Sequence, residues 1–182
     1  MYNIGKIGEN LVSKVDKVNQ MNNFPVPVLM NSVIELLIEA YDGPPNPSST
    51  WFIDNEPDSG ILGQLSGVSA AEASQPVDGH GDPGSTIASN AEHLRWSLAM
   101  MNAAIRGEPL GDWKESWRLL ETDSPGWDRL RAELRVEFNT LLQALKRQTE
   151  LPEEYLSGLL ALLPHAAYHL GTIRQMIERV RA

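Results

Sequence analysis

Four long segments of this chain carry apolar side chains at the spacing of an α-helix, and no segment has a credible strand-like alternation of apolar and polar residues. The four segments span residues 27–41, 85–107, 124–148 and 152–181. In the third segment, for example, Leu130, Leu134 and Phe138 fall on one face. Such a face has to be buried against a neighbour, and helices meet that need by packing on one another. The sequence therefore predicts an all-α protein, built as an antiparallel four-helix bundle.

Local signals mark the ends of these helices. A run rich in Gly and Pro follows Asp42 and ends the first helix, because proline lacks the backbone N–H that a helix interior requires. Ser85 or Thr86 is expected to cap the second helix, and Gly107 is expected to end it. Pro125 suits the first turn of the third helix.

The connections differ widely in length. Residues 43–84 form a long loop between the first and second main helices, and we expect it to be ordered because its apolar side chains would otherwise lie in water. Within it, residues 66–73 are expected to form a short helical turn capped by Ser69. Residues 1–26 are an N-terminal extension, with a short helix predicted between residues 9 and 18. The chain, residues 1–182, is expected to fold as a single domain.

Two tryptophans lie in the connection between the second and third helices. Trp113 and Trp117 are four residues apart, which places both rings on one side of a single helical turn. Such a pair serves more often to pack against a neighbouring element than to bind a ligand. We interpret it as a packing contact.

Composition narrows the functional classes. The chain has no cysteine, so it has no disulfides and any metal would be held by nitrogen and oxygen ligands. Its formal net charge of -9 at pH 7 argues against nucleic-acid binding, which requires Lys and Arg against the phosphates. The sequence also lacks a secretory signal and an apolar run long enough to span a membrane. We therefore expect a cytoplasmic protein that binds neither nucleic acid nor membrane.

The histidines carry the strongest indication of chemistry. His165 and His169 lie four residues apart in the last helical segment, so both imidazoles lie on one largely apolar face. A buried imidazole needs a partner, either a metal ion or a hydrogen-bonding group. His93, in the second helical segment, is the candidate third ligand, because catalytic zinc sites commonly use three protein ligands. His80 lies in a glycine-rich loop and is interpreted as a solvated residue.

Other catalytic constellations are weak in this sequence. No serine lies in a strand-turn-helix nucleophile elbow, and no glycine-rich loop follows a strand as a phosphate site requires. The Glu-x-x-His pairs that build di-iron centres in helical bundles are absent as well. The functional hypothesis therefore depends on the histidines.

Two stretches carry a resemblance to a known family. Residues 85–94 read STIASNAEHL, and residues 165–175 read HAAYHLGTIRQ, with the pattern His-x-x-x-His-x-Gly-x-x-Arg-Gln. From about residue 28 onward the chain resembles the DinB-like four-helix proteins, which include YfiT-like metal-dependent hydrolases. The resemblance implies a homodimer and a divalent metal ion, such as zinc or nickel. The metal ligands that it implies are His93, His165 and His169.

The same resemblance implies an enzyme, either a hydrolase or a thiol transferase that acts on a small molecule. The ion would keep one position open, where it could lower the pKa of a water molecule or stabilise a substrate thiolate. The loop of residues 43–84 is expected to cover this open face. Glu92 and Asp82 are candidates for a general base by proximity in sequence alone.

Two alternatives stay open from the sequence. Asn90 lies one turn before His93 on a similar helix face, and a family ligand at that position would leave the metal site incomplete. The histidines could instead be structural, in a non-enzymatic dimeric bundle whose apolar faces associate. Stoichiometric metal in the purified protein would separate the enzyme hypothesis from this second alternative.

Overall fold

The structure, a computed structural model, describes residues 26–79, 81–148 and 153–182. Within these ranges the chain is helical and has no β-strand, which confirms the prediction of an all-α protein. The elements are α2 (Val26–Asp42), α3 (Ile61–Ser66), α4 (Ala70–Ser74), α5 (Ile87–Ile105), the 3-10 helix η1 (Trp113–Trp117), α6 (Ser124–Arg147) and α7 (Glu153–Arg181). The helix predicted at residues 9–18 and the loop residue His80 lie outside the described residues.

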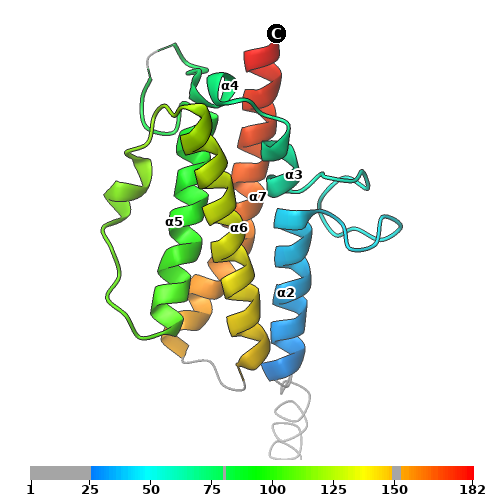
Figure 1. Ribbon diagram of the computed structural model, residues 1–182. Coiled ribbons are helices and arrows are strands. Elements are labelled where there is room, and N and C mark those ends of the chain that lie inside the picture. The colour runs from blue at the N-terminus through cyan, green and yellow to red at the C-terminus, as the bar shows by residue number, and fades with distance from the viewer. Residues whose placement is uncertain (1–25, 80, 149–152) are drawn as a thin grey trace, which may run out of the picture.

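The four long helices α2, α5, α6 and α7 are those predicted from the apolar stripes, with bounds that agree within two residues. They lie side by side in Figure 1, where α5 and α2 each contact both α6 and α7. Their apolar faces form one continuous core, in which the rings of Tyr41 and Phe138 stack with centroids 4.7 Å apart. None of the helices in the described ranges is both long and apolar enough to cross a membrane.

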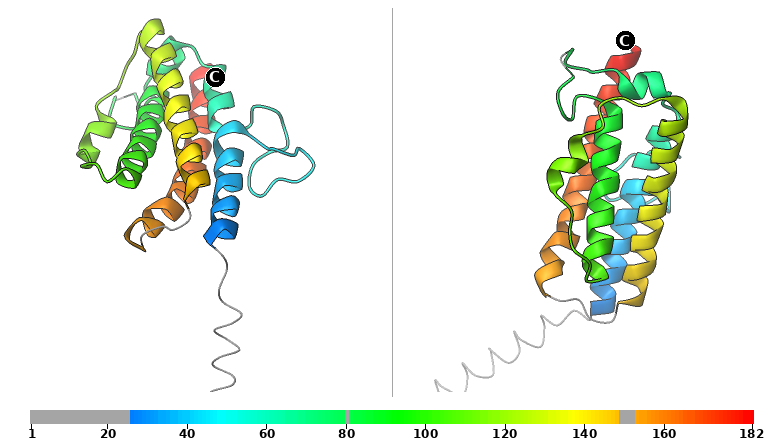
Figure 2. Two further views of the ribbon diagram at one scale, coloured as in Figure 1. Left: turned by 60° about the horizontal axis from the view of Figure 1, so that its bottom comes forward. Right: turned by 60° about the vertical axis from the view of Figure 1, so that its left-hand side comes forward.

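Helices α5 and α6 run in the same direction, so the prediction of a simple antiparallel bundle is wrong for this pair. Arg95 faces Glu133 and Asn102 donates a hydrogen bond to Glu137, so residue numbers increase together along the two helices. The connection of residues 106–123 makes this possible, because it runs back along α5 and carries η1 on the way (Figures 1 and 2). This return path lays η1 against the outer face of α5.

The long connection between α2 and α5 is ordered, and burial of apolar residues explains this only in part: Ile61 and Leu65 are buried as expected, whereas Trp51 and Phe52 are exposed. Trp51 is 70% exposed, so burial of its ring does not hold the loop. Instead the buried Glu39 accepts hydrogen bonds at its Oε1 atom from three successive backbone N–H groups, at 2.8, 2.8 and 3.2 Å. Arg174 of α7 ties the same loop through Asp54 and the carbonyl of Ser59. Polar contacts to α2 and α7 therefore fix this part of the loop.

Further along this connection the chain forms two short helices. The predicted helical turn is present as α4, and Ser69 caps it in a capping box with Glu72. The preceding helix, α3, was not predicted, although its Ile61 and Leu65 are fully buried against the long helices. Only six residues long, α3 is too short to show a clear apolar period in the sequence.

Removing the Glu39 carboxylate is expected to lower the free energy of unfolding by roughly 2–4 kcal/mol, because three N–H groups lose a charged acceptor. Urea denaturation of Glu39→Ala measures this loss. Glu35→Ala is the matched control: Glu35 lies one turn earlier on α2, is exposed and accepts one hydrogen bond from the indole of Trp51. A loss of equal size in both variants would contradict this account of the loop.

Candidate metal centre

Helices α5 and α7 bring the three predicted histidines into one cluster. His165 and His169 lie on the same face of α7, and His93 faces them from α5. Within the described residues, these three side chains form a group whose candidate ligand atoms all lie within 4.8 Å of one another. His93 and His169 are buried, at 9% and 4% exposure, and His165 is half-buried. His165 and His169 therefore share a face as their spacing predicted, the candidate third ligand His93 joins them, and the cluster is largely shielded from water.

A hydrogen bond from His169 to Asn90 fixes the ring of His169. The Asn90 side-chain N–H₂ group donates to the carbonyls of Gly84 and Thr86, at 2.8 and 2.9 Å, so its Oδ1 atom is turned toward α7. This oxygen lies 2.9 Å from Nδ1 of His169 and accepts its proton. The Nε2 atom of His169 then keeps a free lone pair, as a metal ligand requires.

Ser116 of η1 fixes the ring of His93 in the same way. The Ser116 hydroxyl donates its only proton to the carbonyl of Trp113 at 2.6 Å. Its oxygen lies 2.7 Å from Nδ1 of His93, so this nitrogen must carry a proton and donate it. Trp117 stacks on the other side of the imidazole, with ring centroids 3.8 Å apart and an angle of 15° between the planes. The connection that returns along α5 thus sets both the tautomer and the orientation of His93.

The geometry of the cluster fits a divalent metal ion. The Nε2 atoms of His93 and His165 lie 3.0 Å apart. Two imidazole nitrogens bound to one tetrahedral zinc ion at about 2.0–2.1 Å would lie about 3.3 Å apart, so this pair needs little adjustment, and the third ligand atom lies within 4.8 Å of both. Without an ion, His165 donates its Nε2 proton to His93, whose own proton is on Nδ1. A metal ion bound to both Nε2 atoms would take the place of this one shared proton between His165 and His93.

Asn90 acts behind His169 and is not placed as a ligand. The sequence had left open that the position of the third ligand is taken by Asn90, which would make the metal site incomplete. His93 occupies the place beside the α7 histidines, while Asn90 binds the far nitrogen of His169. Asn90 and His93 lie three residues apart on one side of α5, so His93 can join the cluster while Asn90 binds the ring of His169.

Burial lowers the pKa of all three histidines. Desolvation, and secondarily the like charge of His165, lowers the pKa of His93 to about 4. The same causes, with His93 as a further like charge, lower the pKa of His169 to about 3. Desolvation also lowers the pKa of His165. At neutral pH the three imidazoles are therefore uncharged, which is the form that binds metal.

These pKa shifts predict that the metal-free protein loses stability on mild acidification. Above pH 6.5 neither the folded nor the unfolded chain protonates these imidazoles, so they add no pH dependence. Below pH 6.5 these histidines are protonated in the unfolded chain but stay uncharged in the folded chain. The free energy of unfolding therefore falls by at most about 1.4 kcal/mol per pH unit for each histidine. Urea denaturation between pH 7.5 and 4.5 measures this slope. His169→Gln should have a shallower slope than the wild type, and equal slopes would contradict the prediction.

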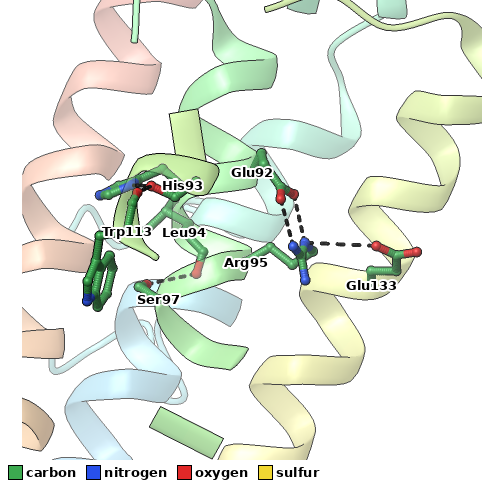
Figure 3. A network of polar contacts seen from close by, with 8 residues as sticks. Glu92, His93, Leu94, Arg95, Ser97, Trp113 and Glu133 are labelled. Carbon is green, nitrogen blue, oxygen red and sulfur yellow. Dashed lines mark hydrogen bonds and ion pairs between the residues drawn. The ribbon is translucent and has the colours of Figure 1, made fainter. Parts of the chain in front are cut away.

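Glu92 does not face the cluster. It accepts two hydrogen bonds from Arg95, at 2.7 and 2.6 Å, and Arg95 in turn lies 3.9 Å from Glu133 of α6. Figure 3 shows this network on the opposite side of α5 from His93 and Trp113. Asp82, the other residue considered as a base, is exposed in the loop before α5 and does not belong to the histidine group. Among the described residues, no carboxylate joins the three imidazoles.

The prediction that residues 43–84 cover the open face is wrong for the described part of that loop. A cavity of about 560 Å³ adjoins His93 and His165, and its wall comes from α5, from α7, and from Leu110 and Trp113 of the α5–α6 connection. Sequence reasoning assigned Trp113 and Trp117 to packing. The stacking of Trp117 on His93 agrees with that assignment, whereas Trp113 is 49% exposed and lines the cavity. Nothing in the sequence indicated a role for Ser116. Its contact with His93 forms only because the connection between α5 and α6 returns along α5, and residue spacing does not predict that path.

Other residues of the motif on α7 lie outside the centre. Arg174 binds the loop through Asp54 and Ser59, and Gln175 is exposed on the helix surface. A Cβ atom at Gly171 would meet no neighbour, so packing within this chain does not require glycine there. Of this motif, only the two histidines build the cluster.

No match emerges from comparison with known proteins: no protein-family model, no curated protein and no solved structure is similar enough to the chain.

Proposed function

We propose that this protein is a divalent-metal-dependent enzyme of the DinB-like and YfiT-like four-helix type, with His93, His165 and His169 as the metal ligands. The observation that carries the proposal is the convergence of the three imidazoles, two of which are held by hydrogen bonds at Nδ1 so that Nε2 is free. Metal-binding histidines commonly donate their other N–H to an oxygen, as His93 and His169 do here.

The residues present suit a catalytic ion more than a purely structural one. Three protein ligands leave a coordination position open, and the cavity beside His93 and His165 gives access to it. A bound divalent ion supplies Lewis acidity at that position. Neutral imidazole ligands suit zinc, nickel or another first-row ion, and we propose one of these as the cofactor.

Residues around the cluster would hold the histidine ligands in the orientation that metal binding requires. Asn90 and Ser116 hold the ring planes of His169 and His93, and Trp117 prevents the His93 ring from rotating. Burial excludes water from the inner side of the cluster and keeps the imidazoles unprotonated. The reaction class is proposed to be hydrolysis or thiol transfer, on a small molecule bound in the adjoining cavity, by a homodimeric protein.

A non-enzymatic dimeric bundle is the second candidate. The observation that favours it is the hydrogen bond of 3.0 Å between His165 and His93, which gives the Nε2 atoms of both rings a partner without an ion. In that case the cluster would stabilise the contact between α5 and α7, and the purified protein would hold no metal.

Activity that follows the metal distinguishes the two candidates. The tag-free protein is stripped with a chelator, reloaded with Zn²⁺ or Ni²⁺, and assayed for hydrolysis of 4-nitrophenyl acetate and for transfer of a small thiol to 1-chloro-2,4-dinitrobenzene. The proposal expects at least one activity that disappears on chelation and in His169→Ala. Loaded wild-type protein that is no more active than this variant in either assay would favour the non-enzymatic bundle.

A further inference from the structure

The cavity beside the histidine cluster has a strongly apolar wall. It measures about 560 Å³, a size typical of sites for small organic molecules. Its wall comes from residues 93–104 of α5, residues 155–165 of α7, and Leu110 and Trp113 of the connection between α5 and α6. Its apolar lining includes Met100, Met101, Ala104, Leu110, Trp113 and Leu162.

Among the side chains that the structure describes, which do not include those of residues 153 and 154, no charged group lines this cavity. Ser97, Tyr155 and the two histidines are the polar residues of the wall, and the Ser97 hydroxyl already donates to the carbonyl of Leu94 at 2.8 Å. The cavity of about 660 Å³ on the α6 side of α5 differs sharply, because Glu, Asp and Arg side chains line it. A charged ligand group in the apolar cavity would lose its hydration without gaining an ionic partner.

The outer rim of the cavity exposes large apolar side chains. Leu110 is 57% exposed and Trp113 is 49% exposed, although both border the cavity. The chain holds the rim close to α5 at Gly111, whose N–H group donates to Sδ of Met100 at 3.1 Å. A Cβ atom at Gly111 would lie 2.8 Å from the ring of Trp96, so only glycine permits this close approach. A fixed apolar rim of this kind is typical of a ligand-binding surface.

We propose, resting on the metal centre proposed above, that the substrate is a small molecule with an uncharged apolar tail and one terminal head group bearing a lone-pair donor. The tail fills the cavity along Met101 and Leu162, and the head group reaches the cluster between His93 and His165. The apolar wall thus selects the substrate by its tail, while the histidine cluster binds a head group common to many molecules.

A homologous series of metal-binding probes tests this inference. The zinc-loaded full chain is titrated calorimetrically with n-alkyl hydroxamates from acetohydroxamate to octanohydroxamate, which share one head group and differ in tail length. Each added methylene is expected to increase affinity about fourfold until the cavity is full, as transfer of a methylene from water predicts. An affinity that does not change along the series would overturn the inference.

Two neighbouring positions of α7 provide a matched pair of variants. Ala161 lines the cavity, whereas Leu160 does not, and both are exposed. Ala161→Phe should reduce the affinity for octanohydroxamate at least about tenfold by filling the cavity, while Leu160→Phe should bind it as the wild type does. Equal effects in both variants would contradict a tail site here. So would an Ala161→Phe variant that shifts the monomer–dimer equilibrium without affecting hydroxamate binding, because a second copy would then be the occupant.

A metal-free arm separates failure of this inference from failure of the proposed function. The uncharged fluorescent probe N-phenyl-1-naphthylamine should bind the metal-free wild type and Leu160→Phe, and bind Ala161→Phe at least about tenfold more weakly. If the protein takes up no metal, the proposed function fails and probe binding alone decides whether the cavity accepts apolar tails. If metal binds but neither probe binding nor the hydroxamate series depends on Ala161, the tail site is wrong while the metal centre stands.

Discussion

Replacing His169 with alanine is expected to weaken Zn²⁺ binding at least about 100-fold and to abolish stoichiometric metal in the purified protein. Apparent binding free energies of four-ligand zinc sites are about 10–16 kcal/mol, so one ligand contributes about 3 kcal/mol. His169 is 4% exposed and its Nδ1 is fixed by Asn90, so no other described side chain replaces its Nε2 atom. Competition titration with a chromophoric chelator measures the two affinities.

The control for this loss is Gln175→Ala on the same helix. Gln175 is exposed and its amide reaches only Glu178, at 3.4 Å. The affinity of the Gln175→Ala variant for Zn²⁺ should equal that of the wild type. Because a buried substitution can also disturb folding, His165→Ala at a half-buried position provides a second test, with helix content followed by circular dichroism. A folded His169→Ala or His165→Ala protein that retains wild-type affinity would contradict the assignment of ligands.

Replacing Ser116 with alanine is expected to weaken Zn²⁺ binding about 10- to 100-fold, although Ser116 is not a ligand. Its oxygen accepts the Nδ1 proton of His93, which keeps the lone pair of Nε2 directed at the cluster. Outer hydrogen-bond partners of metal-binding histidines have effects of this size. Without the hydroxyl, the His93 ring is free to change tautomer, and a lone pair on Nδ1 would face an apolar methyl group.

Ser97→Ala is a closely matched control for Ser116→Ala. Both serines are buried and both hydroxyls donate to a backbone carbonyl three residues earlier, but only Ser116 accepts from a histidine. Both substitutions should destabilise the fold, Ser116→Ala more strongly because it also removes the acceptor of the His93 proton, but only Ser116→Ala should weaken metal binding. Equal metal affinities in the two variants would show that Ser116 does not position His93.

The sequence was sufficient to predict the long helices and the pairing of His165 with His169, because both depend on periodicity along a single helix. His93 lies on another helix, and periodicity alone did not assign it to the cluster. Apolar stripes located α2, α5, α6 and α7, and the four-residue spacing of His165 and His169 placed both rings on one face. The same rule could have excluded Glu92 as a base. Adjacent residues of a helix point about 100 degrees apart, so Glu92 and His93 face different neighbours.

The direction of α6 and the surroundings of His93 could not be predicted in this way. Periodicity shows which face of a helix is buried but not which way the helix runs, and a connection as long as residues 106–123 permits either direction. Ser116 and Trp117 acquire their contacts with His93 only because this connection returns along α5. Likewise, the role of Glu39 depends on backbone N–H groups that a loop presents after folding.

Metal content of the full chain, expressed and purified without a histidine tag, tests the central claim most directly. Elemental analysis of the wild type should find close to one zinc, nickel or similar divalent ion per chain, and Zn²⁺ added to chelator-treated protein should bind with the same stoichiometry. His169→Ala, prepared in parallel, should contain none. Tag-free wild-type protein that contains no metal and binds none on addition would contradict the metal centre, and would leave the hydrogen-bonded histidines as a structural contact between α5 and α7.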